Sequence, residues 1–292
     1  MNGIRRVGVL GAGLMGSGIA QVAASCGFDT VVRDVSEAAL ARGRAAVEKS
    51  LAKFVEKGQL LADARDAALQ RMTWSTDLGA VATTDIIIEA VTEDLPLKTA
   101  LYRDLHPRTA DETIFASNTS SLSIVTLAAA SGRPDRFVGL HFFNPVPLMP
   151  LVEVVRAVTT SEATFARALA FARGLGKDAV AARDGSGFIV NRLLVPYLLD
   201  AVRSLEQGTG SVADIDRAMM LGCGHPMGPF TLLDFVGLDT TLRIGEIMFD
   251  EYREPRFAPP ALLRRMVAAG WLGRKSGRGF YDYSVNPPVV AM

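Results

Sequence analysis

The sequence predicts an α/β domain built on a mostly parallel sheet, followed by a domain in which helices dominate. In the first part of the chain, short apolar segments rich in β-branched residues alternate with longer segments of helical periodicity. This is the pattern of parallel strands covered by helices on both faces. Beyond residue 187 the strand-like segments stop. We therefore expect a boundary at residues 184–187, which separates an α/β domain of residues 1–185 from an all-α domain of residues 186–292.

The strands of the first domain are expected where short apolar segments stand alone. They lie at residues 7–10, 30–33, 86–89, 113–116, 137–140 and 151–155, and helical patterns occupy residues 15–25, 37–57 and 96–105. Right-handed crossovers would connect consecutive parallel strands.

The connection after the second expected strand is unusually long. Residues 36–71 hold enough Ala-, Lys- and Glu-rich sequence for about two helices, with a break at Gly58, whereas a simple nucleotide-binding half has one crossover helix. We expect an inserted helical hairpin. It either decorates the sheet or projects to help hold the substrate.

In the second domain, residues 188–207 carry an apolar stripe at helical spacing, which predicts an amphipathic helix. Pro196 lies inside this segment and predicts a kink or a local break, because proline removes a helical hydrogen bond. Further helices are expected at residues 212–221, 230–236, 239–249 and 261–269.

Composition excludes several classes of function. The chain of 292 residues has 31 Lys+Arg and 31 Asp+Glu, so it lacks the basic surplus that nucleic-acid binding requires. Cys26 and Cys223 have neither metal-site spacing nor partners for a disulfide framework, which predicts a reduced, cytoplasmic protein without a metal site. No apolar run approaches the ~18 residues of a membrane span. The start of the chain resembles a secretion signal only superficially, because its glycines are spaced as in a nucleotide-binding turn.

The first expected strand is followed by the turn Gly11-Ala12-Gly13-Leu14-Met15-Gly16, which opens a helix. Glycines at this spacing let backbone N–H groups approach a pyrophosphate at the helix N-terminus, as in a Rossmann-type domain. Asp34 ends the next expected strand, where a carboxylate binds the ribose hydroxyls of NAD and repels the 2′-phosphate of NADP. Asp34 could instead be an ordinary helix-start residue, and the neighbouring Arg33 could accept a phosphate. The two features together predict NAD binding and make NADP the less favoured cofactor.

His141 ends an apolar expected strand, at the edge where open α/β sheets bind ligands. Glu153 interrupts the apolar run of the next expected strand, and a proline-rich turn at residues 144–150 joins the two segments. A glutamate bonded to one imidazole nitrogen fixes the tautomer and raises the basicity of the other. The pair is a candidate for acid–base catalysis, although a structural ion pair or a solvent-facing Glu153 would fit the same spacing.

Polar residues at two other places could donate to a substrate oxygen as negative charge develops on it. Asn118 and Ser120 follow the expected strand 113–116, and Asn191 lies in the first turn of an apolar helix. Either group could equally serve as a helix cap or a structural amide.

Several long motifs resemble those of the short-chain L-3-hydroxyacyl-CoA dehydrogenases, in particular the bacterial 3-hydroxybutyryl-CoA dehydrogenase type. The resemblance runs from end to end. The motifs are GAGLMGSGIA (11–20), IIIEAVTEDLPLK (86–98), ASNTSSLSI (116–124), GLHFFNPVPLMPLVEVV (139–155), GFIVNRLLVPYL (187–198), HPMGPF (225–230) and GWLGRKSGRGFYDY (270–283).

The resemblance implies a role for each matching position. His141 would be the general base, Glu153 would orient it, and Ser120 and Asn191 would bind the reacting oxygen or the thioester carbonyl. Residues that would contact NAD are Gly11, Gly13, Leu14, Met15, Gly16, Asp34, Glu93, Lys98 and Asn118. Residues in the hairpin that would hold the coenzyme A portion are Ser50 and Lys57, assisted by Lys53.

The resemblance also implies a homodimer formed through the helical domain, and a monofunctional enzyme, because the hydratase portion of fused relatives is absent. Two departures are Ser186 and Pro150, which stand where many members have proline and lysine. They bear on the domain connection and on substrate contacts and remove no reacting group. A dehydrogenase of the same fold that acts on a free hydroxy acid, and a non-catalytic NAD-binding protein, are the alternatives.

Overall fold

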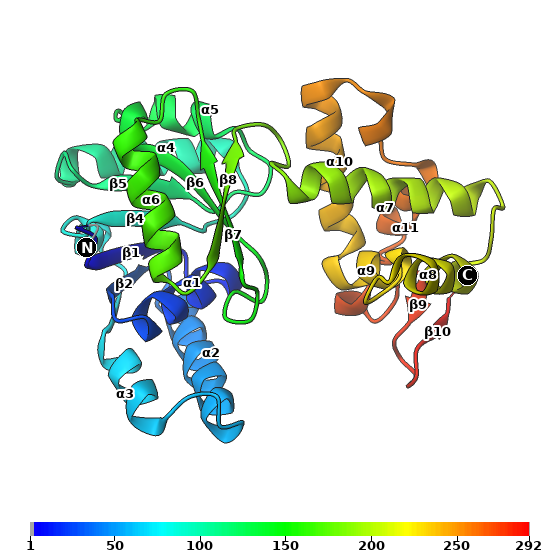
Figure 1. Ribbon diagram of the computed structural model, residues 1–292, viewed down its shortest axis with the longest axis horizontal. Helices are drawn as coiled ribbons and strands as arrows, with labels where there is room; N and C mark the ends of the chain where they lie inside the picture. Colours follow the sequence, from blue (N-terminus) through cyan, green and yellow to red (C-terminus); the bar gives the residue numbers. More distant parts are fainter. Residues whose placement is uncertain (1–2, 292) are drawn as a thin grey trace. The chain divides into compact units, whose positions relative to one another are not determined.

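The computed structural model describes residues 3–291, which form two compact units. The first unit ends at Phe188 and the second begins at Ile189. Figure 1 shows an α/β unit in blue to green and a helical unit in green to red.

An eight-stranded sheet with the order β3-β2-β1-β4-β5-β6-β7-β8 forms the centre of the first unit. The strands β1 to β6 are parallel, β7 is antiparallel to β6, and β8 is parallel to β7. The predicted mostly parallel sheet is therefore confirmed. The strands are β1 (Arg6–Leu10), β2 (Asp29–Arg33), β3 (Met72–Ser75), β4 (Ile86–Glu89), β5 (Ile114–Ser117), β6 (Phe137–Phe142), β7 (Leu151–Arg156) and β8 (Asp178–Arg183).

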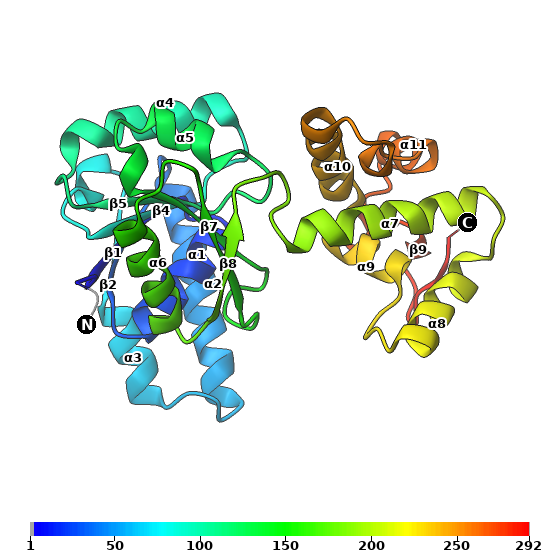
Figure 2. The same cartoon turned by 45° about the horizontal axis from the view of Figure 1, so that its top comes forward.

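Helices cover both faces of this sheet, as Figure 2 shows. They are α1 (Leu14–Ser25), α2 (Glu37–Glu56), α3 (Ala62–Gln70), α4 (Leu95–Leu105), α5 (Ile124–Ala130) and α6 (Glu162–Gly174). One apolar core joins the sheet to α1, α2 and α6, and a second joins it to α4 and α5. The central strands are buried along their whole length and consist mostly of apolar residues, because both of their faces are covered.

The two outermost strands, β3 and β8, were not expected from the sequence. Most of their side chains are half-buried or exposed. Edge strands of this kind lack the continuous apolar run that marks a central parallel strand.

The expected helical hairpin is present as α2 and α3. Ser36 caps α2, because its side chain accepts a hydrogen bond from the Ala39 N–H. Gly58 follows the end of α2 with a φ of +67°, a left-handed conformation that stops a helix without steric cost.

The second unit contains α7 (Val190–Glu206), α8 (Val212–Cys223), α9 (Pro229–Val236), α10 (Leu238–Tyr252) and α11 (Ala261–Ala268). It also contains a two-stranded antiparallel sheet of β9 (Tyr281–Asp282) and β10 (Val289–Val290), so the expectation of helices alone is corrected by this small sheet. A kink or a local break was expected at Pro196, and the break is wrong, because α7 continues through it.

Two buried carboxylates organise the interior of the second unit. Asp216 accepts hydrogen bonds from the Phe230 and Thr231 N–H groups at the start of α9, at 2.7 and 3.0 Å. Asp234 accepts hydrogen bonds from the N–H groups of Phe280 and Tyr281, each at 2.9 Å. These contacts give a structural reason for the HPMGPF and GRGFYDY motifs. No helix within residues 3–291 is both long and apolar enough to cross a bilayer.

Candidate active site

The glycine turn joins the end of β1 to the start of α1, and each of its glycines meets a different requirement. Gly11 has a φ of +101°, and its N–H donates to the Arg33 carbonyl at 2.8 Å. A Cβ on Gly16 would lie 1.8 Å from the Gly11 carbonyl oxygen, whereas a Cβ on Gly13 would meet nothing within 4 Å. Gly11 and Gly16 therefore shape the turn, and Gly13 leaves its outer side open to a ligand.

The N-terminus of α1 carries the features of an anion site. Gly13 is the N-cap and provides no side-chain cap, and the first turn holds no acidic residue. The first N–H groups of a helix lack partners inside the helix, and the helix dipole favours negative charge there. The residues present therefore fit the pyrophosphate of a dinucleotide.

Asp34 lies beside this turn, immediately after β2. Its carboxylate accepts a hydrogen bond from the Ala12 N–H at 2.8 Å and one from the Ser36 N–H at 3.3 Å. The Arg33 side chain donates from Nε to the Thr76 carbonyl at 3.2 Å. The adjacent carboxylate is thus fixed to the glycine turn, and the guanidinium is engaged by the backbone that follows β3.

His141 and Glu153 lie directly opposite each other in the antiparallel pair of β6 and β7. The His141 Nδ1 and a carboxylate oxygen of Glu153 are 2.6 Å apart, Glu153 has no exposed surface and His141 is 6% exposed. The imidazole also contacts the rings of Phe143 and Phe188, with centroids 4.5 and 5.6 Å away. The contact with Glu153 uses Nδ1, so Nε2 is the nitrogen that can exchange a proton with a ligand.

The Glu93 carboxylate binds the loop that follows β5. Its carboxylate accepts hydrogen bonds from the Thr119 hydroxyl, from the Ser120 N–H at 3.1 Å and from the Ser121 hydroxyl at 3.2 Å. Burial acts to raise the pKa of Glu93, but the Lys98 ammonium and these hydrogen bonds outweigh it and hold the pKa below its ordinary value. Glu93 is therefore an ionised group that ties the loops after β4 and β5 together.

Lys98 lies beneath Glu93 in the interior, with 1% of its surface exposed. Its Nζ is 2.6 Å from Glu89 and 3.1 Å from Glu93. Glu89 is completely buried at the end of β4 and also accepts hydrogen bonds from the Val91 N–H and the Ser117 hydroxyl. Of Glu93 and Lys98, which were both expected to contact the cofactor, Glu93 is the accessible one. Glu89 was missed because it reads as part of an apolar strand.

The remaining expected site residues have different environments. The Asn118 side-chain oxygen accepts a hydrogen bond from the Phe142 N–H at 2.9 Å, which links the ends of β5 and β6 beside His141. The amide nitrogen of Asn118 remains the group that can donate to a ligand. Ser120 is half-buried on the same loop. Asn191 lies in the first turn of α7, in the second unit.

The segment at residues 184–188 is also bonded to α5 and to the loop that follows β5. This attachment was not expected from the sequence. Asp184 accepts hydrogen bonds from the N–H groups of Ile124 and Val125 at 2.9 and 2.7 Å, at the start of α5. Ser186 donates to the Ser121 carbonyl at 3.2 Å. Phe188, whose φ is +46°, packs against His141. An aspartate before glycines was the available signal, since such residues often cap helices.

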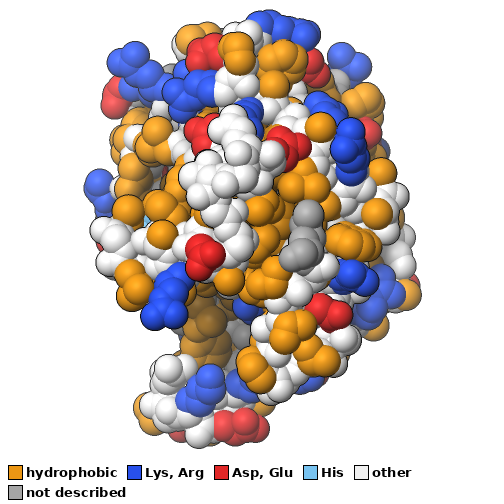
Figure 3. Space-filling view, turned by 90° about the vertical axis from the view of Figure 1, so that its right-hand side faces the viewer, with side chains coloured by type: hydrophobic (Ala, Val, Ile, Leu, Met, Phe, Trp, Pro, Cys, Tyr) orange, Lys and Arg blue, Asp and Glu red, His pale blue; other side chains and the backbone are white. Residues whose placement is uncertain are grey.

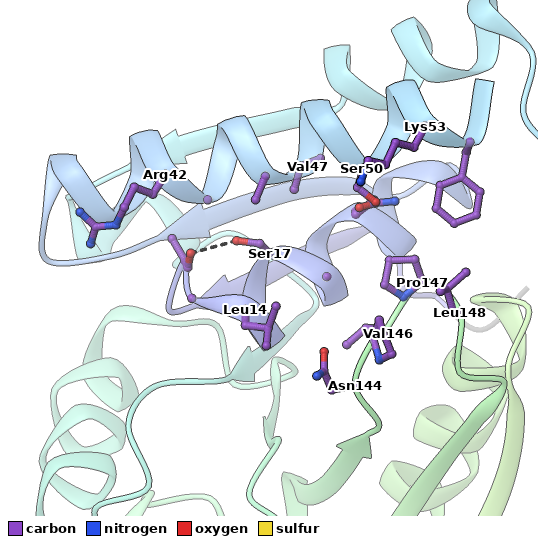
Figure 4. Close-up of a pocket in the computed structure, with 18 of the residues that line it drawn as sticks. Leu14, Ser17, Arg42, Val47, Ser50, Lys53, Asn144, Val146, Pro147 and Leu148 are labelled. Carbon is purple, nitrogen blue, oxygen red and sulfur yellow. Dashed lines mark hydrogen bonds between the residues drawn. The ribbon is translucent and has the colours of Figure 1, made fainter. Parts of the chain in front are cut away.

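A cavity of about 620 Å³ lies along α2. The hairpin residues Ser50, Lys53 and Lys57 line one wall together with Phe54, and residues 144–148 line the opposite wall. Figure 4 shows Ser50 and Lys53 on α2, opposite Val146, Pro147 and Leu148 of the turn after β6. The three hairpin positions expected to hold coenzyme A thus share one cavity. Residues 3–291 contain no cluster of three or more His, Cys, Asp or Glu side chains suited to a metal ion.

Two family models match almost the whole chain. The NAD binding domain of 3-hydroxyacyl-CoA dehydrogenase matches residues 6–185, and the C-terminal domain of 3-hydroxyacyl-CoA dehydrogenase matches residues 187–283. The chain belongs to the 3-hydroxyacyl-CoA dehydrogenase family. The expected family is confirmed, and with it the expected enzyme class, a dehydrogenase, and the expected cofactor, NAD.

Within the 3-hydroxyacyl-CoA dehydrogenase family, the chain is similar to bacterial and mammalian members. It is 50% identical over 282 residues to the 3-hydroxybutyryl-CoA dehydrogenase of Mycobacterium tuberculosis, covering 96% of this chain and 99% of that protein. It is 47% identical over 287 residues to the human mitochondrial hydroxyacyl-coenzyme A dehydrogenase, covering 96% and 91%. The crystal structure of (S)-3-hydroxybutyryl-CoA dehydrogenase PaaH1 from Ralstonia eutropha matches with a TM-score of 0.94 and 45% identity, covering 97% and 100%.

Proposed function

We propose that this protein interconverts (S)-3-hydroxyacyl-CoA and 3-oxoacyl-CoA with NAD(H), and that 3-hydroxybutyryl-CoA and acetoacetyl-CoA are its substrate pair. The observation that carries the proposal is the buried His141–Glu153 pair, with 2.6 Å between Nδ1 and the carboxylate. His141 lies near the carboxyl end of β6, one of the parallel strands whose carboxyl ends border the ligand crevice in folds of this kind, and Glu153 reaches it from the neighbouring strand β7.

His141 acts as the general acid/base in this proposal. In the oxidative direction its Nε2 takes the proton of the 3-hydroxyl group, and in the reductive direction it returns a proton to the 3-oxo group. Glu153 holds the imidazole through Nδ1 and stabilises the imidazolium that forms. Bound NAD supplies the hydride acceptor.

The other polar groups orient the reactants. The open glycine turn binds the pyrophosphate, and Asp34 faces the adenosine ribose. Glu93 contacts the cofactor in addition to the loop that it holds. Ser120 and Asn191 donate hydrogen bonds to the substrate oxygens. The same atoms become more strongly hydrogen-bonded as negative charge develops during the reaction.

The cavity along α2 takes the coenzyme A portion of the substrate. Lys53 and Lys57 supply ammonium groups suited to its phosphates. Phe54, Val146 and Leu148 supply apolar surface for its less polar parts. Ligand cavities commonly combine such apolar walls with a few charged groups that fix orientation.

A direct assay tests this function. We expect the purified protein to oxidise NADH when acetoacetyl-CoA is added, as followed by NADH absorbance. Free acetoacetate should support far slower turnover, because it lacks the portion that the cavity would bind. Preference for the free acid would instead favour a hydroxy-acid dehydrogenase, and the absence of turnover with any 3-oxo compound would favour a non-catalytic NAD-binding protein.

Two further proposals concern the assembly and location of the protein. We propose a homodimer formed through the second unit, which exposes large apolar side chains such as Leu193, Leu221 and Phe235. Figure 3 shows hydrophobic groups spread over the face of the molecule turned to the viewer.

We also propose a cytoplasmic location, because both cysteines are free thiols. Recovery of the protein in the soluble fraction of gently lysed cells, rather than in a secreted fraction, tests this.

A further inference from the structure

The turn that joins β6 to β7 forms a wall of the cavity along α2, and its conformation is fixed by few contacts of its own. Within the turn, the Leu148 and Met149 N–H groups both donate to the Pro145 carbonyl, at 2.9 and 3.0 Å. Pro145, Pro147 and Pro150 have no N–H to donate. The turn therefore offers few backbone donors of its own, and its carbonyls can accept hydrogen bonds from elsewhere in the chain.

Lys177 provides these donors from the connection between α6 and β8. Its Nζ donates to the Val146 carbonyl at 2.7 Å and to the Met149 carbonyl at 2.8 Å. These are charge-assisted hydrogen bonds, which are shorter and stronger than neutral ones. One ammonium group thus links the middle of the turn to the residue near its end.

A second contact, with helix α1, fixes the same turn. Val146 is 2% exposed and packs against α1, where a Cβ added to Gly18 would lie 2.9 Å from the Val146 Cβ. Val146 is therefore held between Gly18 on one side and the Lys177 ammonium on the other. Pro147 and Leu148, which follow it, face the cavity opposite Ser50 (Figure 4).

We propose that Lys177 is a positioning residue for the coenzyme A portion of the substrate, because it holds the turn at residues 144–149 in the shape that completes the cavity. The inference rests on the proposed function of this cavity. Lys177 itself does not line the cavity, so it acts through the turn and not by contact with the ligand.

The same geometry separates substrate binding from chemistry. The His141–Glu153 pair is fixed by the direct pairing of β6 with β7, which does not depend on Lys177. The glycine turn and Asp34 are held by their own hydrogen bonds. Loss of the Lys177 ammonium should therefore weaken acyl-CoA binding while turnover at saturation and NADH binding are retained.

The experiment compares four proteins by steady-state reduction of acetoacetyl-CoA with NADH. For Lys177→Met we expect the KM for acetoacetyl-CoA to rise by about tenfold, with kcat and the KM for NADH each within about twofold of wild type. Lys177→Arg keeps a cation with several donors and should restore most of the affinity. Arg173→Met removes an exposed cation from the last turn of α6 and should behave as wild type.

Hydrogen–deuterium exchange provides a readout that does not depend on catalysis. In Lys177→Met the peptide that covers residues 146–149 should exchange faster, whereas the strands β6 and β7 should keep their protection. An unchanged KM for acetoacetyl-CoA in a folded Lys177→Met protein would overturn the proposal, and so would an equal rise in Arg173→Met. If Lys177→Met does not fold, Lys177→Gln keeps an uncharged amide N–H donor group and should give a smaller rise, so an unchanged KM in that variant overturns the proposal equally.

The outcomes also distinguish this inference from the proposed function. Wild-type protein that does not reduce acetoacetyl-CoA would refute the function. In that event, unchanged exchange of residues 146–149 in Lys177→Met would separately refute the structural role of Lys177. Active wild-type protein together with an unaffected Lys177 variant would refute only the inference.

Discussion

At the scale of single residues, the proposed proton transfer depends on which imidazole nitrogen is free. Glu153 occupies Nδ1 of His141 from the opposite strand, so catalysis would use Nε2. The surroundings of the pair are apolar, since the Phe143 and Phe188 rings contact the imidazole. Low polarity strengthens the interaction between the imidazolium and its carboxylate.

Replacement of His141 by Gln tests this arrangement. We expect kcat to fall by about 10²–10⁴, the usual contribution of general acid–base catalysis, while NADH still binds. Glu153→Gln should reduce kcat by a smaller factor, because the imidazole remains but loses its charged partner. Steady-state kinetics and a fluorescence titration with NADH measure both effects. Near-normal turnover of His141→Gln would refute the assignment of the base.

The charge of Glu93 leads to a second prediction, which concerns how the free energy of unfolding depends on pH. Its pKa is held below the ordinary value by Lys98 and hydrogen bonds that outweigh burial, so its ionised form favours the folded state. This stabilisation is present above the ordinary glutamate pKa and is lost as the pH falls through the lowered pKa.

The comparison of wild type with Glu93→Gln checks this sign. The difference in the free energy of unfolding should stay constant from about pH 7 to about pH 5 and should narrow as the pH is lowered further toward about 3. Urea titrations at several pH values measure it. Glu251→Gln, on an exposed residue of α10, should show no such trend. A difference that grows in acid would contradict the assigned charge state.

At the scale of elements, the start of α9 depends on a carboxylate from α8. Asp216 is 3% exposed and accepts hydrogen bonds from the Phe230 and Thr231 N–H groups and from the Tyr281 hydroxyl. Gly228 makes this possible, since a Cβ there would lie 2.3 Å from the Asp216 carboxyl carbon. The helix start therefore has no room for a larger residue and no other cap.

Asp216→Ala should accordingly destabilise the second unit by about 3 kcal/mol or more, because buried N–H groups lose their acceptor. Chemical denaturation followed by circular dichroism measures the loss. Asp214→Ala, on an exposed residue of the same helix, should cost about 1 kcal/mol or less. Equal costs for the two variants would show that the buried contacts of Asp216 contribute little.

Three strands of the sheet show why the sequence alone left gaps. The strands β4 and β6 were expected because most of their residues are apolar, which follows from burial on both faces. The strand β8 was missed because five of its six positions are not buried, so nothing in its composition marks a strand. Its pairing with β7 depends on the neighbour and not on its own residues.

At the scale of the whole molecule, the exposed apolar side chains of the second unit lead to a prediction about assembly. Leu193 and Leu221 are 66% and 74% exposed, and isologous dimers are the commonest way in which soluble proteins cover such surface. Light scattering at micromolar protein should give twice the mass of one chain. The mass of a single chain under these conditions would contradict the proposed homodimer.

The alternation of strands and helices, the glycine turn after β1 and the family could be predicted from the amino acids alone, because each depends on residues that lie close together along the chain. The site contacts depend on the folded arrangement. Only the register of β6 and β7 brings Glu153 to His141, only burial encloses Lys98 between Glu89 and Glu93, and only the packing of α6 and β8 brings Lys177 to the turn at residues 144–149. These contacts join residues that are distant along the chain, so they follow from topology and packing and not from any local pattern.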